Sequence, residues 1–137
     1  MGRPEVIRRR LNRLDEYLAI LHELQRYGER EFRSDPEHYG SAERFLHLAI
    51  ETTIDLGNHL IADQELGIVD QYSDVPRLLL QAGLIDEPLA KVWTRMIGFR
   101  NVLVHEYVEI DRGIVYHVLQ HRLEDIEALR TAFARFL

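Results

Sequence analysis

The 137-residue chain contains no cysteine and only one lysine, Lys91, among its 17 basic residues. The absence of cysteine excludes disulfides and thiolate metal sites, and it agrees with a reducing compartment. No apolar run approaches the roughly 18 residues that span a membrane. The first residues, Met-Gly-Arg-Pro-Glu-Val-Ile, also lack the apolar stretch of a secretory signal. These absences predict a cytoplasmic protein without membrane contact.

Positive charge is scarce overall, because the formal net charge is -6 at pH 7. Proteins that coat nucleic acids depend on a net basic surface that neutralises phosphates, so general nucleic-acid binding is disfavoured and we expect no DNA partner. One dense basic patch remains, formed by Arg8, Arg9, Arg10 and Arg13. This patch could bind RNA or an acidic surface of a partner. A run of charged residues is more commonly a solvated surface, and that interpretation also stays open.

Helical periodicity is the strongest pattern that the sequence does contain. The length and the 46% hydrophobic composition predict a single helical domain over residues 1–137. Apolar residues recur at spacings of three and four, which indicates amphipathic helices. The predicted helices cover residues 4 to about 27, 41–65, 76–81, 86 to about 105, and 114 to the C-terminus.

Turn and cap residues separate these stretches. The segment Ser34–Ser41 is rich in turn residues and predicts the first interhelical connection. Asp86 is expected to cap the fourth helix, and Asp111 is a candidate cap for the last one, after a loop over Val108–Gly113. No strand alternation and no internal repeat is visible. The predicted fold is therefore all-α, an antiparallel up-and-down helix bundle of four long helices plus a short one.

A group of polar residues lies at the end of the fourth predicted helix: Arg100, Asn101, His105 and Tyr107. Residues five apart in a helix are separated by about 140° around its axis, so Arg100 and His105 do not share a face. Arg100 and Tyr107 nearly align. Either the helix breaks near His105, or the two side chains converge in a groove shared with a second subunit.

These residue types suit RNA cleavage without a metal. A histidine, with an ordinary pKa of about 6.5, can take the proton of a 2′-hydroxyl or deliver one to the leaving oxygen. Arg100 can bind the scissile phosphate bidentately, and Asn101 can orient the phosphate or a backbone group. A complete acid–base pair needs two proton-transfer groups, and a symmetric dimer would supply two copies of His105.

A purely structural reading of the same residues also stands. A histidine near a helix C-terminus interacts favourably with the helix dipole, and Arg100 and Tyr107 can close the bundle with hydrogen bonds.

The string Arg100-Asn-Val-Leu-Val-His105-Glu-Tyr107 resembles the signature of HEPN toxins of the HepT type: arginine, four residues, histidine, one residue, tyrosine. The resemblance extends over nearly the whole chain. The other segments that carry it are Asp55-Leu-Gly-Asn-His-Leu60, Gly83-Leu-Ile-Asp86, Met96-Ile-Gly-Phe-Arg100, Ile110-Asp-Arg-Gly-Ile-Val-Tyr116 and Leu123-Glu-Asp-Ile126.

The resemblance implies a homodimeric endoribonuclease toxin that uses no metal or other cofactor and is paired with a minimal nucleotidyltransferase (MNT) antitoxin. It assigns Arg100 and His105 as catalytic residues and Asn101 as their support. The antitoxins of such pairs attach AMP to the motif tyrosine, which is Tyr107 here. A bulky anion beside Arg100 would compete for its guanidinium and block the phosphate site.

Three further groups of polar residues give weaker indications of function. Glu51, Asp55 and His59 share a face of the second predicted helix and are expected to form a polar seam that supports Arg100. His117 and His121 have zinc-ligand spacing but no acidic residue that completes such a motif, so we interpret them as solvated or core-edge residues. The acidic pair Glu124 and Glu127 resembles those of pyrophosphohydrolases, but the chain has no second matching pair.

Two alternatives of other functional classes remain open. One is a non-catalytic HEPN module that binds a nucleotidyltransferase. The other is a metal-dependent hydrolase built on a helix bundle.

Overall fold

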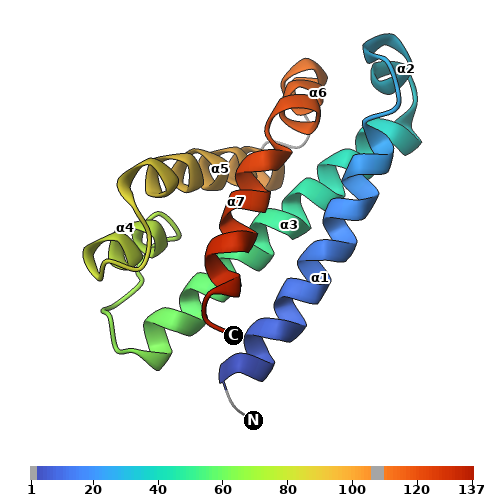
Figure 1. The fold of residues 1–137 in the computed structure, drawn as a ribbon. Helices are drawn as coiled ribbons and strands as arrows, with labels where there is room; N and C mark the ends of the chain where they lie inside the picture. The colour runs from blue at the N-terminus through green and yellow to red at the C-terminus, as the bar shows by residue number, and fades with distance from the viewer. Residues whose placement is uncertain (1–2, 106–109) are drawn as a thin grey trace.

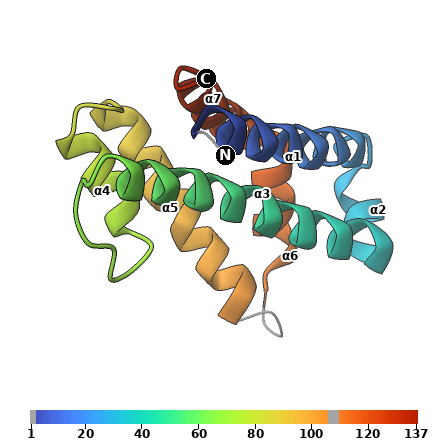
Figure 2. The ribbon, with the colours of Figure 1, turned by 90° about the horizontal axis from the view of Figure 1, so that it is seen from below.

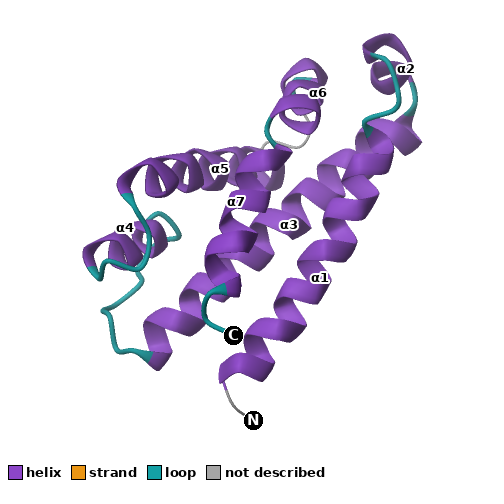
Figure 3. Ribbon diagram, in the orientation of Figure 1, coloured by secondary structure: helices purple, strands orange, loops and turns teal. Residues whose placement is uncertain are grey.

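The computed structural model describes residues 3–105 and 110–137, which form helices and connecting loops without strands (Figure 3). This confirms the all-α bundle. The helices are α1 (Arg3–Leu24), α2 (Glu29–Ser34), α3 (Pro36–Asp63), α4 (Asp74–Gln81), α5 (Glu87–His105), α6 (Arg112–His121) and α7 (Leu123–Ala134).

The long helices α1 and α3 lie side by side and run in opposite directions (Figure 1). Helix α5 crosses α3, and its C-terminal end projects away from α1, as the view from below shows (Figure 2). Helix α7 packs against α1, α3 and α5, and both ends of the described chain lie at the same end of the bundle. Helix α3 is therefore the element that connects α1 with the C-terminal half of α5.

Buried contacts between α3 and α5 fix how these two helices cross. Trp93 of α5 is fully buried, and its indole Nε1–H donates a hydrogen bond to Oγ1 of Thr53 at 3.0 Å. The Thr53 hydroxyl in turn donates to the Ile50 carbonyl at 2.6 Å. Because both polar groups of the pair are satisfied, the indole is buried without an orphaned donor. This contact anchors the half of α5 that precedes the motif.

Helix α3 begins earlier than the sequence predicts. Asp35 is its N-cap, because its Oδ1 accepts a hydrogen bond from the Glu37 N–H at 2.9 Å, and Pro36 occupies the first turn. An acidic cap followed by proline is a favoured helix start. The expected connection over Ser34–Ser41 is thus wrong, and only Asp35 separates α2 from α3. The first predicted helix, over residues 4 to about 27, is confirmed as α1, which ends at Leu24, and the short helix α2 that follows it was not predicted as a separate element.

The last predicted helix is two helices, broken at Arg122. Helix α6 packs on α2 and α3, whereas α7 packs on α1, α3 and α5. The break lets each segment turn its apolar stripe towards a different set of neighbours. Two predicted caps are confirmed: Oδ1 of Asp86 accepts from the Leu89 N–H at 3.0 Å, and Oδ1 of Asp111 accepts from the Gly113 N–H at 2.7 Å.

Candidate functional site

Helix α5 carries Arg100, Asn101 and His105 on one unbroken helical segment that reaches His105. A break between Arg100 and His105 is therefore excluded, and the two side chains leave the helix about 140° apart. Arg100 is half-buried against α3, whereas Asn101 and His105 are exposed. The structure shows no helix break before His105, and convergence of the two side chains in a groove shared with a second subunit stays a prediction.

The guanidinium of Arg100 is held by Glu51 of α3. Its Nε donates to Glu51 Oε2 at 2.7 Å, and its Nη2 donates to Oε1 at 3.3 Å. This is a bidentate pair, the geometry in which an arginine–carboxylate contact is strongest and most directional. The Arg100 side chain is 11% exposed and that of Glu51 is 27% exposed. The pair is thus partly shielded from solvent and orients the guanidinium plane.

Tyr72, in the connection between α3 and α4, completes the surroundings of this pair. The Cζ atom of Arg100 lies 4.7 Å from the centre of the Tyr72 ring, within the range of a cation–π contact. The Tyr72 hydroxyl donates to Glu51 Oε1 at 3.4 Å. The ring and the carboxylate together restrict the rotation of the guanidinium.

His47 approaches the same carboxylate from one turn earlier in α3. Its Nε2 lies 3.7 Å from Glu51 Oε2. Burial lowers the pKa of His47, Glu51 opposes that shift, and the positive charge of Arg100 adds to it. A lowered pKa favours the neutral imidazole beside Arg100.

Arg100 retains donors for a ligand after these contacts. A guanidinium has five N–H groups. Among the described residues, Glu51 accepts from two of them, and Asn101 Oδ1 accepts one from Nη1 at 3.0 Å. One N–H on each of Nη1 and Nη2 remains, which is the pair that binds two oxygens of a phosphate. Asn101 therefore contacts Arg100 directly, as its predicted supporting role requires.

The other predicted site residues are placed as follows. Tyr107 lies outside the described residues. Asp55 and His59 are on α3 beyond Glu51, and the hydrogen bonds and ion pairs recorded for Arg100 within the described ranges go to Glu51 and Asn101 instead. Burial raises the pKa of Asp55. The buried Nε2 atom of His59 has no hydrogen-bond partner among the described residues.

Sequence reasoning singled out the face of α3 but not the contact that matters most on it. Glu51 was expected only as part of a seam with Asp55 and His59, and Tyr72 was missed. The two partners lie 49 and 28 positions from Arg100 in the sequence, so no helical spacing connects them. Only the crossing of α3 and α5 brings them together.

The remaining polar groups do not assemble a metal centre. His117 and His121 are exposed, with ring centres 4.9 Å apart, which confirms the solvated reading. Glu127 pairs with His22, because the Oε1 atom of Glu127 lies 3.0 Å from the Nε2 atom of His22. In residues 3–105 and 110–137, no three side chains of histidine, aspartate or glutamate are grouped to hold a metal ion. In the same ranges, no helix has the length and apolarity that crossing a membrane requires.

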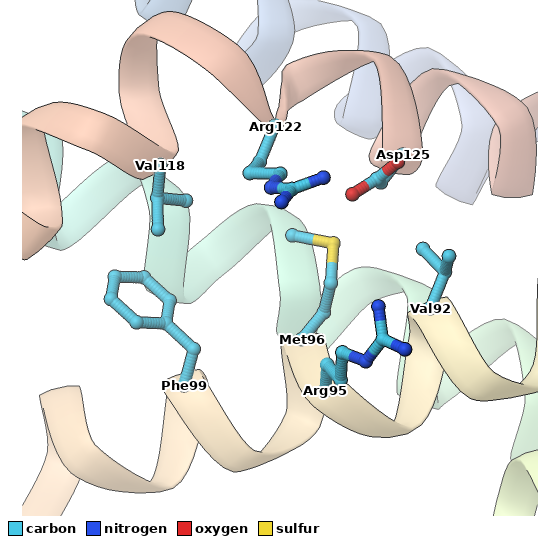
Figure 4. Close-up of a pocket in the computed structure, with 7 residues that line it drawn as sticks. All are labelled: Val92, Arg95, Met96, Phe99, Val118, Arg122 and Asp125. Atoms are coloured by element: carbon cyan, nitrogen blue, oxygen red, sulfur yellow. The ribbon is translucent and has the colours of Figure 1, made fainter.

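A separate cavity of about 140 Å³ lies between α5 and the α6–α7 break (Figure 4). Met96 and Phe99 line it from α5, and Arg122 and Asp125 line it from the opposite side. None of the predicted site residues that the structure describes borders it. We therefore locate the candidate site at Arg100 and not in this cavity.

A helix bundle with an arginine–histidine motif at the end of one helix is the arrangement of HEPN domains. The sequence profile of the family described as "Ribonuclease HepT-like" matches residues 14–132, a range that includes the whole motif. The chain belongs to this HepT-like family, which confirms the resemblance noted in the sequence.

Two relatives show how far the similarity extends. The chain is 40% identical to the mRNA nuclease HepT of Shewanella oneidensis over 104 residues, which cover 75% of this chain and 78% of the relative. It is 27% identical to the tRNA nuclease HepT of Aphanizomenon flos-aquae over 124 residues, which cover 88% and 82% of the two chains.

Solved structures agree with the sequence comparison. A crystal structure of a toxin–antitoxin with AMP-PNP superposes with a TM-score of 0.88 at 30% identity, covering 96% of this chain and 98% of its own. The tri-AMPylated HEPN toxin of Shewanella oneidensis in complex with MNT antitoxin gives a TM-score of 0.87 at 30% identity, covering 98% and 99%. The chain is thus similar to HEPN toxins over nearly its full length.

Proposed function

We propose that this chain is the cytoplasmic toxin of a HEPN/MNT toxin–antitoxin pair and acts as a metal-independent endoribonuclease. The observation that carries the proposal is the oriented guanidinium of Arg100, which keeps two N–H groups for a phosphate and precedes His105 by five residues on α5. Relatives named as mRNA and tRNA nucleases support RNA as the class of substrate.

In the proposed reaction, His105 takes the proton of a ribose 2′-hydroxyl, and the resulting oxygen attacks the adjacent phosphorus. The bond from phosphorus to the 5′-oxygen breaks, and a second proton-transfer group protonates the leaving oxygen. The products are a 2′,3′-cyclic phosphate and a free 5′-hydroxyl. Arg100 stabilises the charge that builds up on the pentacoordinate phosphorus, and Asn101 keeps its guanidinium in place.

The second proton-transfer group is proposed to be His105 of another copy of the chain. Arg100 and His105 diverge around α5, and the exposed His105 belongs to no hydrogen bond or ion pair recorded within the described ranges. A homodimer with two motifs in one cleft supplies two histidines and two arginines to one phosphate.

Regulation is proposed to occur at Tyr107, two residues after His105 in the sequence. The cognate MNT nucleotidyltransferase would transfer AMP from ATP to the Tyr107 hydroxyl with release of pyrophosphate, and the added phosphate would compete with RNA for Arg100. The similarity to a tri-AMPylated HEPN toxin in complex with its antitoxin supports this step. Mass spectrometry of the chain co-expressed with the nucleotidyltransferase should find an AMP increment on the peptide that contains Tyr107, and its absence would count against the step.

The decisive experiment compares the purified wild-type chain with His105→Ala on RNA, with and without EDTA. We expect cleavage by the wild type in EDTA and a loss of about 100- to 10,000-fold in His105→Ala. Equal cleavage by both would contradict the role of His105, and loss of activity in EDTA would favour the metal-dependent alternative. Intact RNA together with a stable nucleotidyltransferase complex would favour the non-catalytic binding module.

A further inference from the structure

A groove of about 260 Å³ runs between α1 and α3, next to the candidate site but distinct from it. Its α1 wall is formed by Arg9, Arg10, Arg13 and Tyr17, and its α3 wall includes Glu51 and Asp55. The groove thus contains three of the four arginines in the only dense basic patch of the sequence.

Helical spacing places these arginines on one ridge. Arg9 and Arg13 are four residues apart and Arg10 and Arg13 are three apart, so their side chains are neighbours on the α1 surface. Two of them have weak contacts: Arg10 Nη1 donates to the Asp55 carbonyl at 3.3 Å, and Arg13 Nε lies 3.9 Å from Glu16 in a largely exposed pair. Such contacts are readily exchanged for a stronger anion.

The charge balance of the groove is positive, although the whole chain has a net charge of -6. Two carboxylates line the groove, but that of Glu51 is already paired with Arg100. The groove lining therefore carries three guanidinium groups and two carboxylates, and one of these carboxylates is engaged by Arg100. A local excess of positive charge in a concave surface attracts a polyanion such as a nucleic-acid strand.

The groove reaches the candidate site through Glu51. Arg10 contacts Asp55 and the Tyr17 ring lies 6.0 Å from that of Phe45, so the antiparallel register of α1 and α3 is fixed. Between these two contacts, Glu51 lies opposite the part of α1 around Arg13. The same carboxylate binds Arg100. The Glu51 side chain therefore both lines the groove and binds the motif arginine.

We propose that this groove binds the phosphates of a single-stranded RNA that extends from the scissile phosphate, with Arg9, Arg10 and Arg13 as the phosphate-binding residues. The proposal rests on the proposed function, because it assigns a path for the substrate of the Arg100 site. Guanidinium groups suit this role because their planar forks bind phosphate oxygens in pairs. The contacts go to the backbone, so they add affinity without base specificity.

The test measures binding of a fluorescein-labelled single-stranded oligouridylate by anisotropy at several KCl concentrations, in a His105→Ala background that does not cleave it. The variant adds Arg9→Gln and Arg13→Gln. The matched control adds Arg77→Gln and Arg135→Gln, which remove two exposed arginines that do not line the groove. A third protein with Arg9→Lys and Arg13→Lys keeps the charge and serves as a rescue. Circular dichroism melts establish that all four proteins are folded.

We expect the groove variant to bind at least roughly tenfold more weakly than its parent, with the slope of log affinity against log salt reduced by about 0.7 for each lost phosphate contact. The control should match the parent, and the lysine variant should keep most of the salt slope. Unchanged affinity and salt slope in the groove variant would overturn the proposal.

Cleavage assays with His105 intact separate this inference from the proposed function. A wild-type chain that leaves RNA intact contradicts the proposed function itself. If the Arg9→Gln/Arg13→Gln variant cleaves RNA with an unchanged KM, only the proposal that the groove binds RNA is contradicted. If that variant instead loses binding of the nucleotidyltransferase while its RNA affinity is unchanged, the groove is a protein-docking surface and the RNA proposal is wrong.

Discussion

At the scale of single residues, the Glu51 carboxylate holds the central position. It pairs bidentately with Arg100, accepts a hydrogen bond from Tyr72, and lines the groove that contains the arginines of α1. An arginine whose guanidinium is already oriented by a carboxylate loses less conformational entropy when it binds a phosphate. Glu51 is therefore expected to position Arg100 and not to contact the substrate.

Replacement of Glu51 by glutamine tests this role. Glutamine keeps the size of the side chain but loses the charge and has one oxygen acceptor, so it cannot offer a separate oxygen to each of Nε and Nη2 of Arg100. We expect kcat for RNA cleavage to fall by about 10- to 100-fold, because a small misplacement of a phosphate-binding group is costly. KM should change less. Steady-state kinetics measure both values.

The control for this substitution is Glu124→Gln, an exposed carboxylate away from Arg100 that should leave kcat unchanged. A melting experiment on both variants separates loss of activity from loss of folded protein. A Glu51→Gln variant with wild-type kcat and a lower KM would show instead that the carboxylate competes with the substrate.

The residues of the motif were predictable from sequence, but their partners were not. Arg100, Asn101 and His105 lie within one and a half turns of a helix, so their grouping is a local property. The partner of Arg100 depends on how two helices cross, and on which of several acidic residues of α3 faces the crossing. Three acidic or titratable candidates shared that face, and helical periodicity does not distinguish among them.

At the scale of elements, the contact of α3 with α4 and α5 depends on one close approach at Gly57. A Cβ atom built at this glycine would lie 2.8 Å from Cη2 of Trp93 and would also collide with Val75. Both neighbours are fully buried. Gly57 therefore allows α4 and α5 to pack directly on the α3 backbone, which positions the half of α5 that leads to Arg100.

The substitution Gly57→Ala should destabilise the protein. Alanine is the better helix former by about 1 kcal/mol, but a methyl group forced into a packed core costs about 1–3 kcal/mol, so the packing cost outweighs the helical gain. Urea unfolding measures the net effect.

The matched control is Gly40→Ala in the same helix, where a Cβ would meet no atom within 4 Å, so this substitution should stabilise the protein by up to about 1 kcal/mol. Destabilisation by both substitutions to the same extent would contradict the packing explanation.

The existence of the long helices was predictable, whereas two of their boundaries were not. Ser34–Ser41 contains many turn residues, but Asp35 and Pro36 also form a strong helix start, and the pairing of α3 with α1 favours the longer helix. At Arg122 the local sequence contains no glycine or proline that would predict a break. The break arises because α6 and α7 pack on different helices, which is a property of the tertiary fold.

At the scale of the whole molecule, charge and geometry favour function as an assembly. The chain is acidic overall, but three of its arginines line the groove between α1 and α3, and Arg100 binds Glu51 of α3. Arg100 is half-buried on α5, and His105 is exposed at the end of the same helix. Under the proposed function, one copy presents its phosphate-binding group and its proton-transfer group in different directions, and we propose that two copies together direct both at one phosphate.

Mixing two inactive variants tests whether the site is shared between copies. In Arg100→Ala dimers both arginines are missing, and in His105→Ala dimers both histidines are missing. Unfolding the two together and refolding them gives about half mixed dimers, each with one arginine and one histidine for the shared cleft. We expect RNA cleavage by the mixture to exceed the mean of the two variants, and to exceed that of His105→Ala by at least about tenfold, because the mixed dimers combine an arginine with a histidine and a single positioned acid or base contributes about 100-fold or more. The control mixes Arg100→Ala with the double variant Arg100→Ala/His105→Ala, which restores no arginine and should stay inactive. If the first mixture shows only the mean activity of its two components, each copy acts alone and the shared cleft is wrong.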